Sequence, residues 1–246
     1  MKEEKRMKYV VVGGNTGGAG VAARLRRLVE RAGIVLLEKG PYMSFSNCGL
    51  PYRLSETIGD TEALVLNTPR SLHDTYNIDA RVFSEAVSVD RKAKKVSVRD
   101  LKSGQTYDES YDKLVLATGA NAVMPPVVGA ENARIFFVKT VEDIDRLYTF
   151  LKTQGAGKVS VVGGGFIGVE VAVNLREAGY RVALVEAMPQ ILRTFDSDMV
   201  QVLQKEMLDK GVELIVGDSV ASFRGSGLLL RSGRTVEGDA VVMAVG

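Results

Sequence analysis

Several residue types are scarce in this chain, and each scarcity excludes a class of protein. Its 246 residues include one cysteine, one histidine and no tryptophan. A single cysteine cannot form a disulfide within the chain, which fits a reducing compartment. No apolar run approaches the roughly 20 residues of a membrane span, and the charged start, KEEKR, has no apolar core of a secretory signal. We therefore expect a cytoplasmic protein with no membrane partner.

An excess of charge is also lacking. The 32 Lys and Arg residues against 30 Asp and Glu residues leave a net charge of +2, which gives no indication of nucleic acid or an anionic membrane as a partner. Apolar residues make up 46% of the chain. This length and composition predict a globular protein with one large or two ordinary domains.

Glycines gather in two places, and the first cluster follows a short apolar strand. Residues 9–13, YVVVG, predict a buried strand, then GGNTGG leads into a helical pattern, and a second strand at 34–37 ends in an acid. In this β-turn-α-β order the turn and the helix N-terminus bind a pyrophosphate, and the acid binds ribose hydroxyls. Asn15 departs from G-x-G-x-x-G, and an ordinary tight turn is the alternative. The candidate residues are Gly13, Gly14, Gly18 and Glu38.

The second cluster carries the complete motif. Residues 159–186 read VSVVGGGFIGVEVAVNLREAGYRVALVE, with a strand before the glycines, a helix after them, and a second strand that ends in an acid. That carboxylate would bond an adenine ribose 2′-hydroxyl and repel a 2′-phosphate, which favours NADH over NADPH unless a neighbouring Arg or Lys reverses the preference. The candidate residues are Gly163, Gly165, Ile167, Gly168, Glu186 and Gly246.

The chain therefore carries two nucleotide-binding units. Their closing strands resemble each other, DKLVLATG at 112–119 and DAVVMAVG at 239–246. We predict a first domain at 1–122, a connection at 123–154 and a second domain at 155–246.

Three local patterns add detail. Residues 79–100 alternate as antiparallel strands do. Thr140 is the expected N-cap of a helix that runs to about Lys152, and Asp196 that of a helix that ends near Gly211.

The only cysteine, Cys48, lies in SFSNCGLPY, residues 44–52. Proline suits the first turn of a helix, so a helix is predicted to begin at Gly49–Pro51. A thiolate at a helix N-terminus is stabilised by the helix dipole and free N–H groups, and it is the nucleophile of disulfide and persulfide chemistry. A buried, inert cysteine is the alternative, against which the polar Ser44, Ser46 and Asn47 argue.

Taken together, these motifs resemble the flavin-dependent pyridine nucleotide-disulfide oxidoreductases. Within them, SFSNCGLPY with one redox cysteine is similar to coenzyme A disulfide reductases, NADH-dependent persulfide reductases, and NADH oxidases and peroxidases; GGNTGGAGVAARLRRL, ESYDKLVLATGA and VVGGGFIGVEVA add to the match. The resemblance implies a glutathione-reductase-like α/β fold of two Rossmann-like units, with FAD on the first, NADH or NADPH on the second, and Cys48 as the redox thiol. It also implies FAD contacts at Lys39, Ala86, Thr118 and Gly119.

The missing second cysteine bears on the reaction. Dithiol enzymes of the superfamily use two cysteines, so here the sulfur must cycle as a mixed disulfide, a sulfenic acid or a persulfide. The resemblance implies that NADH reduces FAD, that the reduced flavin reduces a Cys48–S–S–CoA mixed disulfide, and that the thiolate attacks the next disulfide or persulfide. Oxidases and peroxidases of this group place a histidine where this chain has Thr16, which favours thiol-disulfide chemistry. The only histidine, His73, is expected at the surface.

Coenzyme A would need cations for its phosphates. Arg24 and Arg27 share a face of the first helix, which a solvated basic face also explains. Gly20 and Tyr76 stand where some members have a threonine and a lysine, so persulfides and other low-molecular-weight disulfides stay open as substrates. The substrate contacts that the resemblance implies are Arg27, Ser44 and Asn47.

Members of the family continue past the position of Gly246. The resemblance implies that a segment completing the FAD site, and an interface domain forming a homodimer, are missing here. We expect a flavin-dependent reductase of a small-molecule disulfide or persulfide in the intact protein. An NADH oxidase or peroxidase of the same fold, and a nucleotide-binding fragment without catalysis, are the alternatives. No metal site is predicted.

Overall fold

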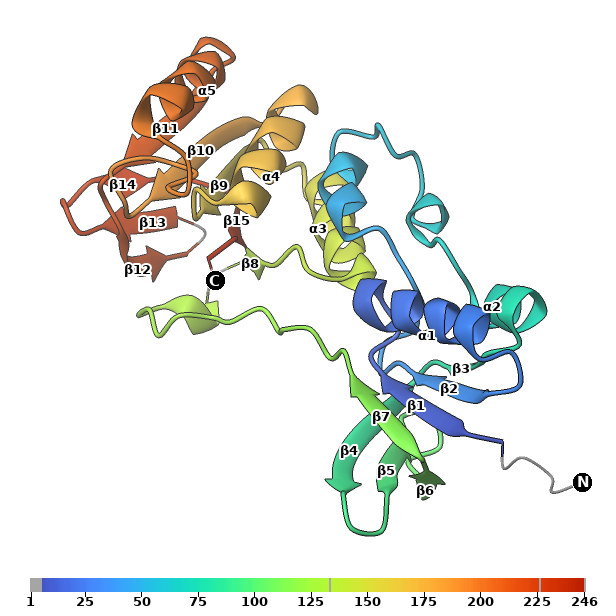
Figure 1. Cartoon of the computed structure of the whole chain (residues 1–246). Coiled ribbons are helices and arrows are strands. Elements are labelled where there is room, and N and C mark those ends of the chain that lie inside the picture. Colours follow the sequence, from blue (N-terminus) through green and yellow to red (C-terminus); the bar gives the residue numbers. More distant parts are fainter. Residues whose placement is uncertain (1–5, 133, 226, 246) are drawn as a thin grey trace, which may run out of the picture. The chain divides into compact units, whose positions relative to one another are not determined.

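The computed structural model describes residues 6–132, 134–225 and 227–245, which fold into helices and strands in the order shown in Figure 1. The chain packs as two compact units, Met1–Ser46 with Val65–Ala120, and Asn47–Leu64 with Asn121–Gly246. The segment that carries Cys48 thus packs with the second unit. The predicted domain limits, 1–122, 123–154 and 155–246, stay a prediction.

A four-stranded parallel sheet in the order β3-β2-β1-β7 forms the centre of the first unit. Its strands are β1 (Lys8–Val12), β2 (Gly33–Leu37), β3 (Asp79–Arg81) and β7 (Lys113–Leu116). The helices are α1 (Thr16–Leu28) and α2 (Pro69–Tyr76). A three-stranded antiparallel sheet consists of β4 (Ser84–Asp90), β5 (Lys95–Asp100) and β6 (Thr106–Ser110).

The central strands of the first unit are buried on both faces. On one side, Val11 and Leu36 pack with Ala22 of α1. On the other side, residues such as Val10 pack against Val96 of the antiparallel sheet. Neighbouring residues of a strand point to opposite faces, so β1 and β2 read as continuous apolar runs.

One prediction for this unit is wrong in part. The alternating stretch 79–100 does not begin with an antiparallel strand, because β3 pairs in parallel with β2, with Leu36 opposite Ala80. The chain returns from β2 through α2, and a crossover of this kind makes its strands parallel. Alternation itself does not distinguish the two directions. The antiparallel sheet starts with β4.

The second unit repeats this plan with a five-stranded parallel sheet in the order β11-β10-β9-β15-β8. Its strands are β8 (Ile135–Phe136), β9 (Lys158–Val162), β10 (Arg181–Glu186), β11 (Val212–Val216) and β15 (Ala240–Met243). Its α-helices are α3 (Val141–Thr153), α4 (Phe166–Glu177) and α5 (Ser197–Asp209). Its antiparallel sheet consists of β12 (Val220–Arg224), β13 (Gly227–Leu230) and β14 (Thr235–Val236). Short 3₁₀ helices are η1 (Asn47–Arg53), η2 (Glu62–Leu64) and η3 (Ala130–Asn132).

The two predicted N-caps differ in outcome. Thr140 caps α3 in a capping box, in which its hydroxyl accepts from the Asp143 N–H and the Asp143 carboxylate accepts from the Thr140 N–H, both at 3.2 Å. Asp196 stands at the N-cap position of α5, but its side chain makes no capping bond. The prediction that Asp196 is the N-cap residue of this helix is confirmed in position, and the helix ends at Asp209, close to Gly211, but the cap lacks a side-chain bond.

The repeat extends to the hydrogen bonds that start each sheet. In the first unit Asp112 accepts from the N–H of Lys8 at 2.9 Å, and in the second unit Asp239 accepts from the N–H of Lys158 at 2.9 Å. Asp239 also accepts from the Gly157 N–H at 2.7 Å. Each aspartate ties the strand before the glycine loop to the strand that closes its unit.

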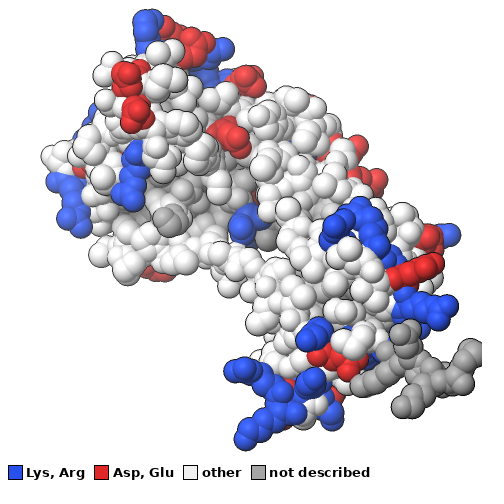
Figure 2. Space-filling view, in the orientation of Figure 1, with Lys and Arg blue, Asp and Glu red and all other residues white. Residues whose placement is uncertain are grey.

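The surface carries both signs of charge. Figure 2 shows basic and acidic side chains interspersed over the visible face of each unit. In the part of the chain that the structure describes, no helix combines the length and apolar character that a bilayer span requires.

Candidate active site

Each unit has a glycine loop between the first strand and the helix that follows. Gly13 and Gly163 have φ angles of +103° and +110°, a backbone conformation that side chains disfavour. A Cβ on Gly18 would lie 1.7 Å from the carbonyl oxygen of Gly13, and a Cβ on Gly168 would lie 1.8 Å from that of Gly163. The glycines therefore allow the sharp turn and the close approach of helix to strand that the motif requires.

The acid that ends the second strand is held by the same loop in both units. The N–H of Gly14 donates to Glu38 Oε2 at 2.7 Å, and the N–H of Gly164 donates to Glu186 Oε2 at 2.5 Å. The other oxygen accepts from Gly40 in the first unit and from Met188 in the second, each at 2.8 Å. Each carboxylate is thus fixed at the carboxyl end of its strand and keeps lone pairs that can accept from ribose hydroxyls.

The helix after each loop presents free backbone donors. The first backbone bond of α4 runs from the Val169 N–H to the Gly165 oxygen, and that of α1 runs from Ala19 to Asn15. The N–H groups before these have no partner within the helix and can bind a pyrophosphate. A Cβ on Gly165 would meet no atom within 4 Å, so the loop is open on its outer side. In the first unit Asn15 takes this position.

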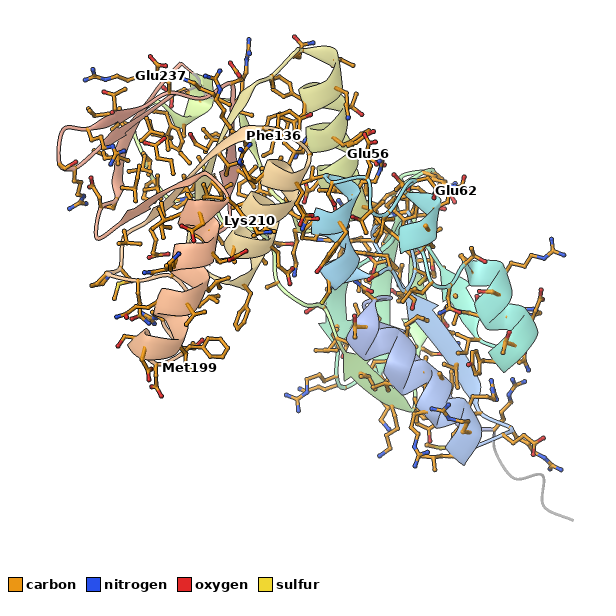
Figure 3. The ribbon with its side chains drawn as sticks, turned by 90° about the horizontal axis from the view of Figure 1, so that it is seen from above. Glu56, Glu62, Phe136, Met199, Lys210 and Glu237 are labelled. Atoms are coloured by element: carbon orange, nitrogen blue, oxygen red, sulfur yellow. The ribbon has the colours of Figure 1, made fainter. Side chains whose placement is uncertain are left out.

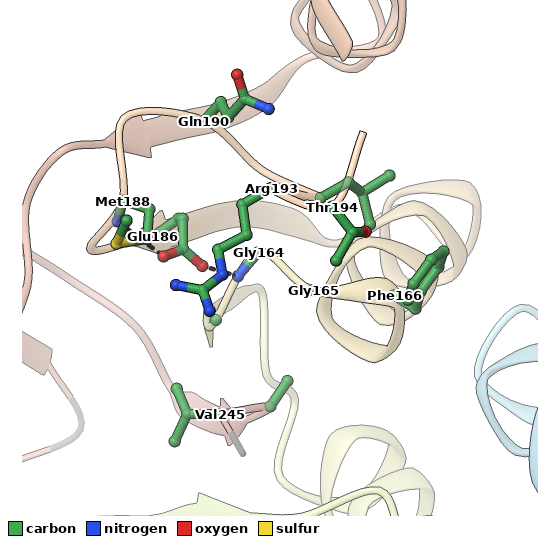
Figure 4. A pocket seen from close by; sticks show the side chains of 12 residues that line it. Gly164, Gly165, Phe166, Glu186, Met188, Gln190, Arg193, Thr194 and Val245 are labelled. Atoms are coloured by element: carbon green, nitrogen blue, oxygen red, sulfur yellow. Dashed lines mark hydrogen bonds between the residues drawn. The ribbon is translucent and has the colours of Figure 1, made fainter. Parts of the chain in front are cut away.

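A cavity of about 400 Å³ lies over the second loop, lined by Gly163–Phe166, Glu186 and the loop after β10 (Figure 4). Its glycine floor, anchored carboxylate and helix N-terminus fit the ADP half of a pyridine nucleotide. The first unit has the same loop, acid and helix N-terminus, which fit the ADP half of FAD. When bound, these two groups would supply the hydride and electron-pair chemistry.

Residues that the sequence analysis missed also line this cavity. They are Gly164, Phe166, Met188, Gln190, Leu192, Arg193, Thr194, Ala244 and Val245. Position alone could have indicated the loop residues, because ligands of such sheets bind outside the carboxyl ends of the strands. The donor role of Gly164 could have been found from Gly14, its counterpart in the first unit.

The remaining cofactor residues are placed by the structure, but their roles stay predictions. Lys39 is exposed directly after Glu38. Ala86 is half-buried on β4 and packs against the cluster that includes Val10 and Val96. Thr118 and Gly119 are exposed in the segment after β7. Ile167 lies in the first turn of α4 and is 47% exposed. Gly246 lies outside the described residues.

Cys48 is a free, exposed thiol near the start of η1. The helix begins at Asn47, two residues before the predicted start, and Pro51 lies inside it. It is a 3₁₀ helix of seven residues, so it offers the thiolate a smaller dipole than the α-helix assumed above. The exposure of Cys48 excludes the alternative of a buried, inert cysteine.

The segment after Cys48 is fastened to α3 by a polar cluster. The Arg53 guanidinium stacks on the Tyr148 ring, 3.6 Å from its centre, and the Tyr148 hydroxyl donates to Glu56 at 2.9 Å. Glu56 is labelled in Figure 3. Lys152 pairs with Glu56 at 2.6 Å. The pKa of Glu56 is lowered, first by the hydrogen bond from Lys152 and then by that from Tyr148. Glu56 therefore keeps its negative charge to a lower pH than an unpaired glutamate does.

The same segment is bonded to α4. The Ser55 hydroxyl donates to Asn174 Oδ1 at 2.6 Å, and Asn174 Nδ2 donates to the Glu170 carbonyl at 2.8 Å. Asn174 is only 3% exposed, so its side chain depends on these partners. The first turn of α4 forms part of the glycine loop that lines the cavity. One helix therefore carries both the dinucleotide loop and a support of the cysteine segment.

The predicted substrate residues lie in different places. Asn47 is exposed next to Cys48 in the second unit, whereas Ser44 belongs to the first unit, where its hydroxyl accepts from Asn67 at 3.2 Å. Arg27 is exposed in the last turn of α1. Its neighbour Arg26 instead donates to backbone carbonyls, including that of Tyr76 at 2.7 Å. Desolvation lowers the pKa of Arg26, which is a structural residue.

Two residues bear on the choice between a reductase and an oxidase or peroxidase, and both are exposed. Thr16 is the first residue of α1, and His73 lies on α2 beside Asp74. Among the described residues, no three His, Cys, Asp or Glu side chains cluster as metal ligands do.

Comparison with known proteins identifies the family. Residues 7–246 match the family described as pyridine nucleotide-disulphide oxidoreductase, and the chain belongs to that family. FAD and NAD(P)H are the cofactors of this family, as the sequence analysis predicts. The α/β fold of two Rossmann-like units is confirmed as well.

Several relatives are similar over nearly the whole chain. Coenzyme A disulfide reductase of Staphylococcus aureus (strain bovine RF122 / ET3-1) is 32% identical over 239 residues, which are 97% of this chain and 54% of the relative. The crystal structure of reduced Bacillus anthracis CoADR-RHD has a TM-score of 0.96 and 38% identity, over 99% of this chain and 44% of that one. A NAD-dependent persulfide reductase from A. fulgidus has a TM-score of 0.92 and 28% identity, over 98% and 46%. The chain spans about half the length of these relatives.

Proposed function

We propose that the protein containing this chain is a flavin-dependent reductase that passes electrons from NADH or NADPH through FAD to Cys48. Its substrate is coenzyme A disulfide, a persulfide or another low-molecular-weight disulfide. The main support is that the only thiol of the chain is exposed on a segment bonded to α4, the helix that also starts at the dinucleotide loop. Relatives named coenzyme A disulfide reductase and persulfide reductase add to it.

The chemistry requires only one cysteine. The Cys48 thiolate attacks one sulfur of the substrate disulfide, a bond forms between the two sulfurs, and the second substrate sulfur leaves as a thiolate. Two electrons and one proton then convert the mixed disulfide into the Cys48 thiolate and a free substrate thiol. When bound, FAD supplies this electron pair, which comes from the pyridine nucleotide.

The other residues have binding roles in this proposal. Glu38 and Glu186, fixed by their glycine loops, accept from ribose hydroxyls of the two cofactors. Arg27, Ser44 and Asn47 stay proposed substrate contacts, taken from the resemblance. The proposal also includes a homodimer of the intact protein.

A mass measurement tests the thiol chemistry directly. The 246-residue chain is incubated with coenzyme A disulfide, and its intact mass is compared for wild type and Cys48→Ser. Since the chain has one cysteine, we expect one coenzyme A adduct in wild type, removed by a reductant and absent from the variant. Iodoacetamide serves as the control for thiol access. If it alkylates Cys48 but none of coenzyme A disulfide, glutathione disulfide or a persulfide donor modifies it, the proposal fails.

The same preparation separates the alternatives. Consumption of oxygen or peroxide with NADH, without any effect of a disulfide, would indicate an oxidase or peroxidase. Binding of nucleotide without any redox reaction would indicate a non-catalytic nucleotide-binding protein. The proposal predicts neither result.

A further inference from the structure

Asn174 is the only polar side chain that is buried on an α-helix in the part of the chain that the structure describes. It lies on α4 close to Val171 and Leu175, which are fully buried. A leucine of similar size would suit this position better, because it has a higher helix propensity and no polar group to remove from water. An amide stabilises such a position only through its hydrogen bonds, so its partners indicate its role.

One of those partners belongs to the cysteine segment, Asn47–Leu64. The Ser55 hydroxyl donates to Asn174 Oδ1 at 2.6 Å, and Asn174 Nδ2 donates to the Glu170 carbonyl of its own helix at 2.8 Å. The Ser55 hydroxyl oxygen also lies 3.0 Å from that of Thr57, which can donate to it. The amide is therefore fixed on α4 by one end and holds the cysteine segment by the other.

The cysteine segment also has apolar anchors, and these do not fix its register. Leu50 and Leu54 are 1% and 2% exposed. Burial of apolar surface stabilises the segment, but it is not directional, so it allows small shifts along the helices. A bond with defined donor and acceptor positions is needed to select one register.

Other polar contacts of the segment are more exposed. The ion pair of Glu56 with Lys152 joins side chains that are 51% and 47% exposed, and pairs of this kind stabilise little. Thr61 donates to the half-buried Asp145 of α3, farther along the segment. Of these contacts, only the bond from Ser55 ends on a buried side chain.

The position of the segment matters for the thiol that it carries. The Cys48 sulfur has to approach a disulfide in the correct direction, and a displacement of about 1 Å can slow a reaction by up to about a hundredfold. Cys48 lies on η1, a 3₁₀ helix of seven residues that ends two residues before Ser55. A shift of Ser55 is therefore transmitted to the thiol.

We propose that Asn174 is a positioning residue for the thiol chemistry. Its bond to Ser55 sets the register of the cysteine segment on α4, and through it the rate at which Cys48 exchanges with a disulfide. Asn174 acts through Ser55 and takes no part in the exchange itself. The inference rests on the proposed function, because it requires Cys48 to be the group that reacts with the substrate.

The two half-reactions of the intact protein, with its FAD bound, test this role. Reduction of the flavin by NADH is followed anaerobically by stopped flow, and then its reoxidation by whichever of coenzyme A disulfide, glutathione disulfide or a persulfide donor oxidises wild type fastest. Asn174→Leu keeps the size of the side chain and removes the bond. We expect it to slow reoxidation about tenfold or more and to change flavin reduction by less than about twofold. A general loss of stability would not produce this difference between the half-reactions.

Variants of the partner residue separate the bond from other effects. Ser55→Ala should slow reoxidation as Asn174→Leu does, and Ser55→Thr, which keeps the hydroxyl, should stay within about threefold of wild type. The double variant should be no slower than the slower single variant, because both changes remove the same bond. Glu56→Gln weakens the exposed contact with α3 and should change reoxidation by less than about twofold. If Asn174→Leu does not fold, the two Ser55 variants decide.

The possible failures are distinguishable. The role of Asn174 is overturned, while the reductase stands, if Ser55→Ala is reoxidised at the wild-type rate, if both half-reactions slow equally, or if Glu56→Gln slows reoxidation as much as Ser55→Ala does. If NADH does not reduce the flavin of wild type, or if none of the three oxidants restores it, the proposed function fails and the inference falls with it.

Discussion

Gly168→Ala tests the close contact between α4 and the strand before it. The added Cβ would lie 1.8 Å from the Gly163 carbonyl oxygen, whereas real Cβ contacts stay above 3.0 Å, so the two must separate by at least 1.2 Å. The strand can hardly move, since β9 pairs with β10 on one side and β15 on the other. The helix is also fixed, because Val171 and Leu175 are fully buried.

The expected loss follows from these constraints. Overpacking typically costs about 1–3 kcal/mol, and because both elements are fixed we take about 3 kcal/mol here. The better helix propensity of alanine returns about 1 kcal/mol. We therefore expect a net loss of about 2 kcal/mol, or a melting temperature lowered by roughly 4–8 °C in a chain of this size. Thermal unfolding followed by circular dichroism measures this shift.

Gly165→Ala is the matched control, since it lies in the same loop and its Cβ would meet no atom within 4 Å. As an N-cap change it should cost less than about 1 kcal/mol. Its methyl group would enter the cavity, so NAD⁺ binding should weaken about tenfold or more. The reasoning is refuted if Gly168→Ala is as stable as wild type, or if Gly165→Ala is the less stable of the two.

Three further predictions concern polar contacts. The pKa of Asp239 is lowered, chiefly by two backbone N–H bonds. Its contribution to stability is therefore present above the unfolded carboxyl pKa of about 3.9 and is lost as the pH falls through the lower folded pKa. The difference in urea midpoint between wild type and Asp239→Asn should narrow from pH 7 toward about pH 3, and a constant difference would contradict this. Ser55→Ala and Asn174→Ala should show a coupling energy of about 1 kcal/mol in a double-mutant cycle of urea unfolding, and additive effects would contradict the bond. Thr140→Ala should cost about 1 kcal/mol in urea unfolding, clearly more than Asp196→Ala, because only Thr140 makes a capping bond.

The parts of the site that the sequence predicts are those fixed by local sterics. Gly13, Gly18, Gly163 and Gly168 are required by positive φ angles or by helix contacts within a few residues, so their spacing identifies them. The acid after the second strand of each unit, Glu38 or Glu186, follows from the length of the helix and strand that separate it from the glycine loop. Alternation within a strand likewise predicts burial, but it leaves the direction of β3 undetermined.

The parts that the sequence does not predict depend on distant residues. The Cys48 segment packs with the second unit through bonds such as Ser55–Asn174, whose members lie 119 residues apart. Arg193 approaches Glu186 only because the loop after β10 folds back onto the glycine turn. Asp196 has the residue type of an N-cap, and only the structure shows that its side chain does not make the bond.

The central claim is that Cys48 carries electrons from a pyridine nucleotide, through a bound flavin, to a disulfide. The most direct test is an anaerobic titration with NADH, followed by addition of coenzyme A disulfide, while the flavin spectrum is recorded for wild type and Cys48→Ser. We predict that NADH bleaches the flavin band in both proteins, and that the disulfide restores it in wild type but not in the variant. Recovery at the same rate in Cys48→Ser, or the lack of any flavin band, would contradict the account.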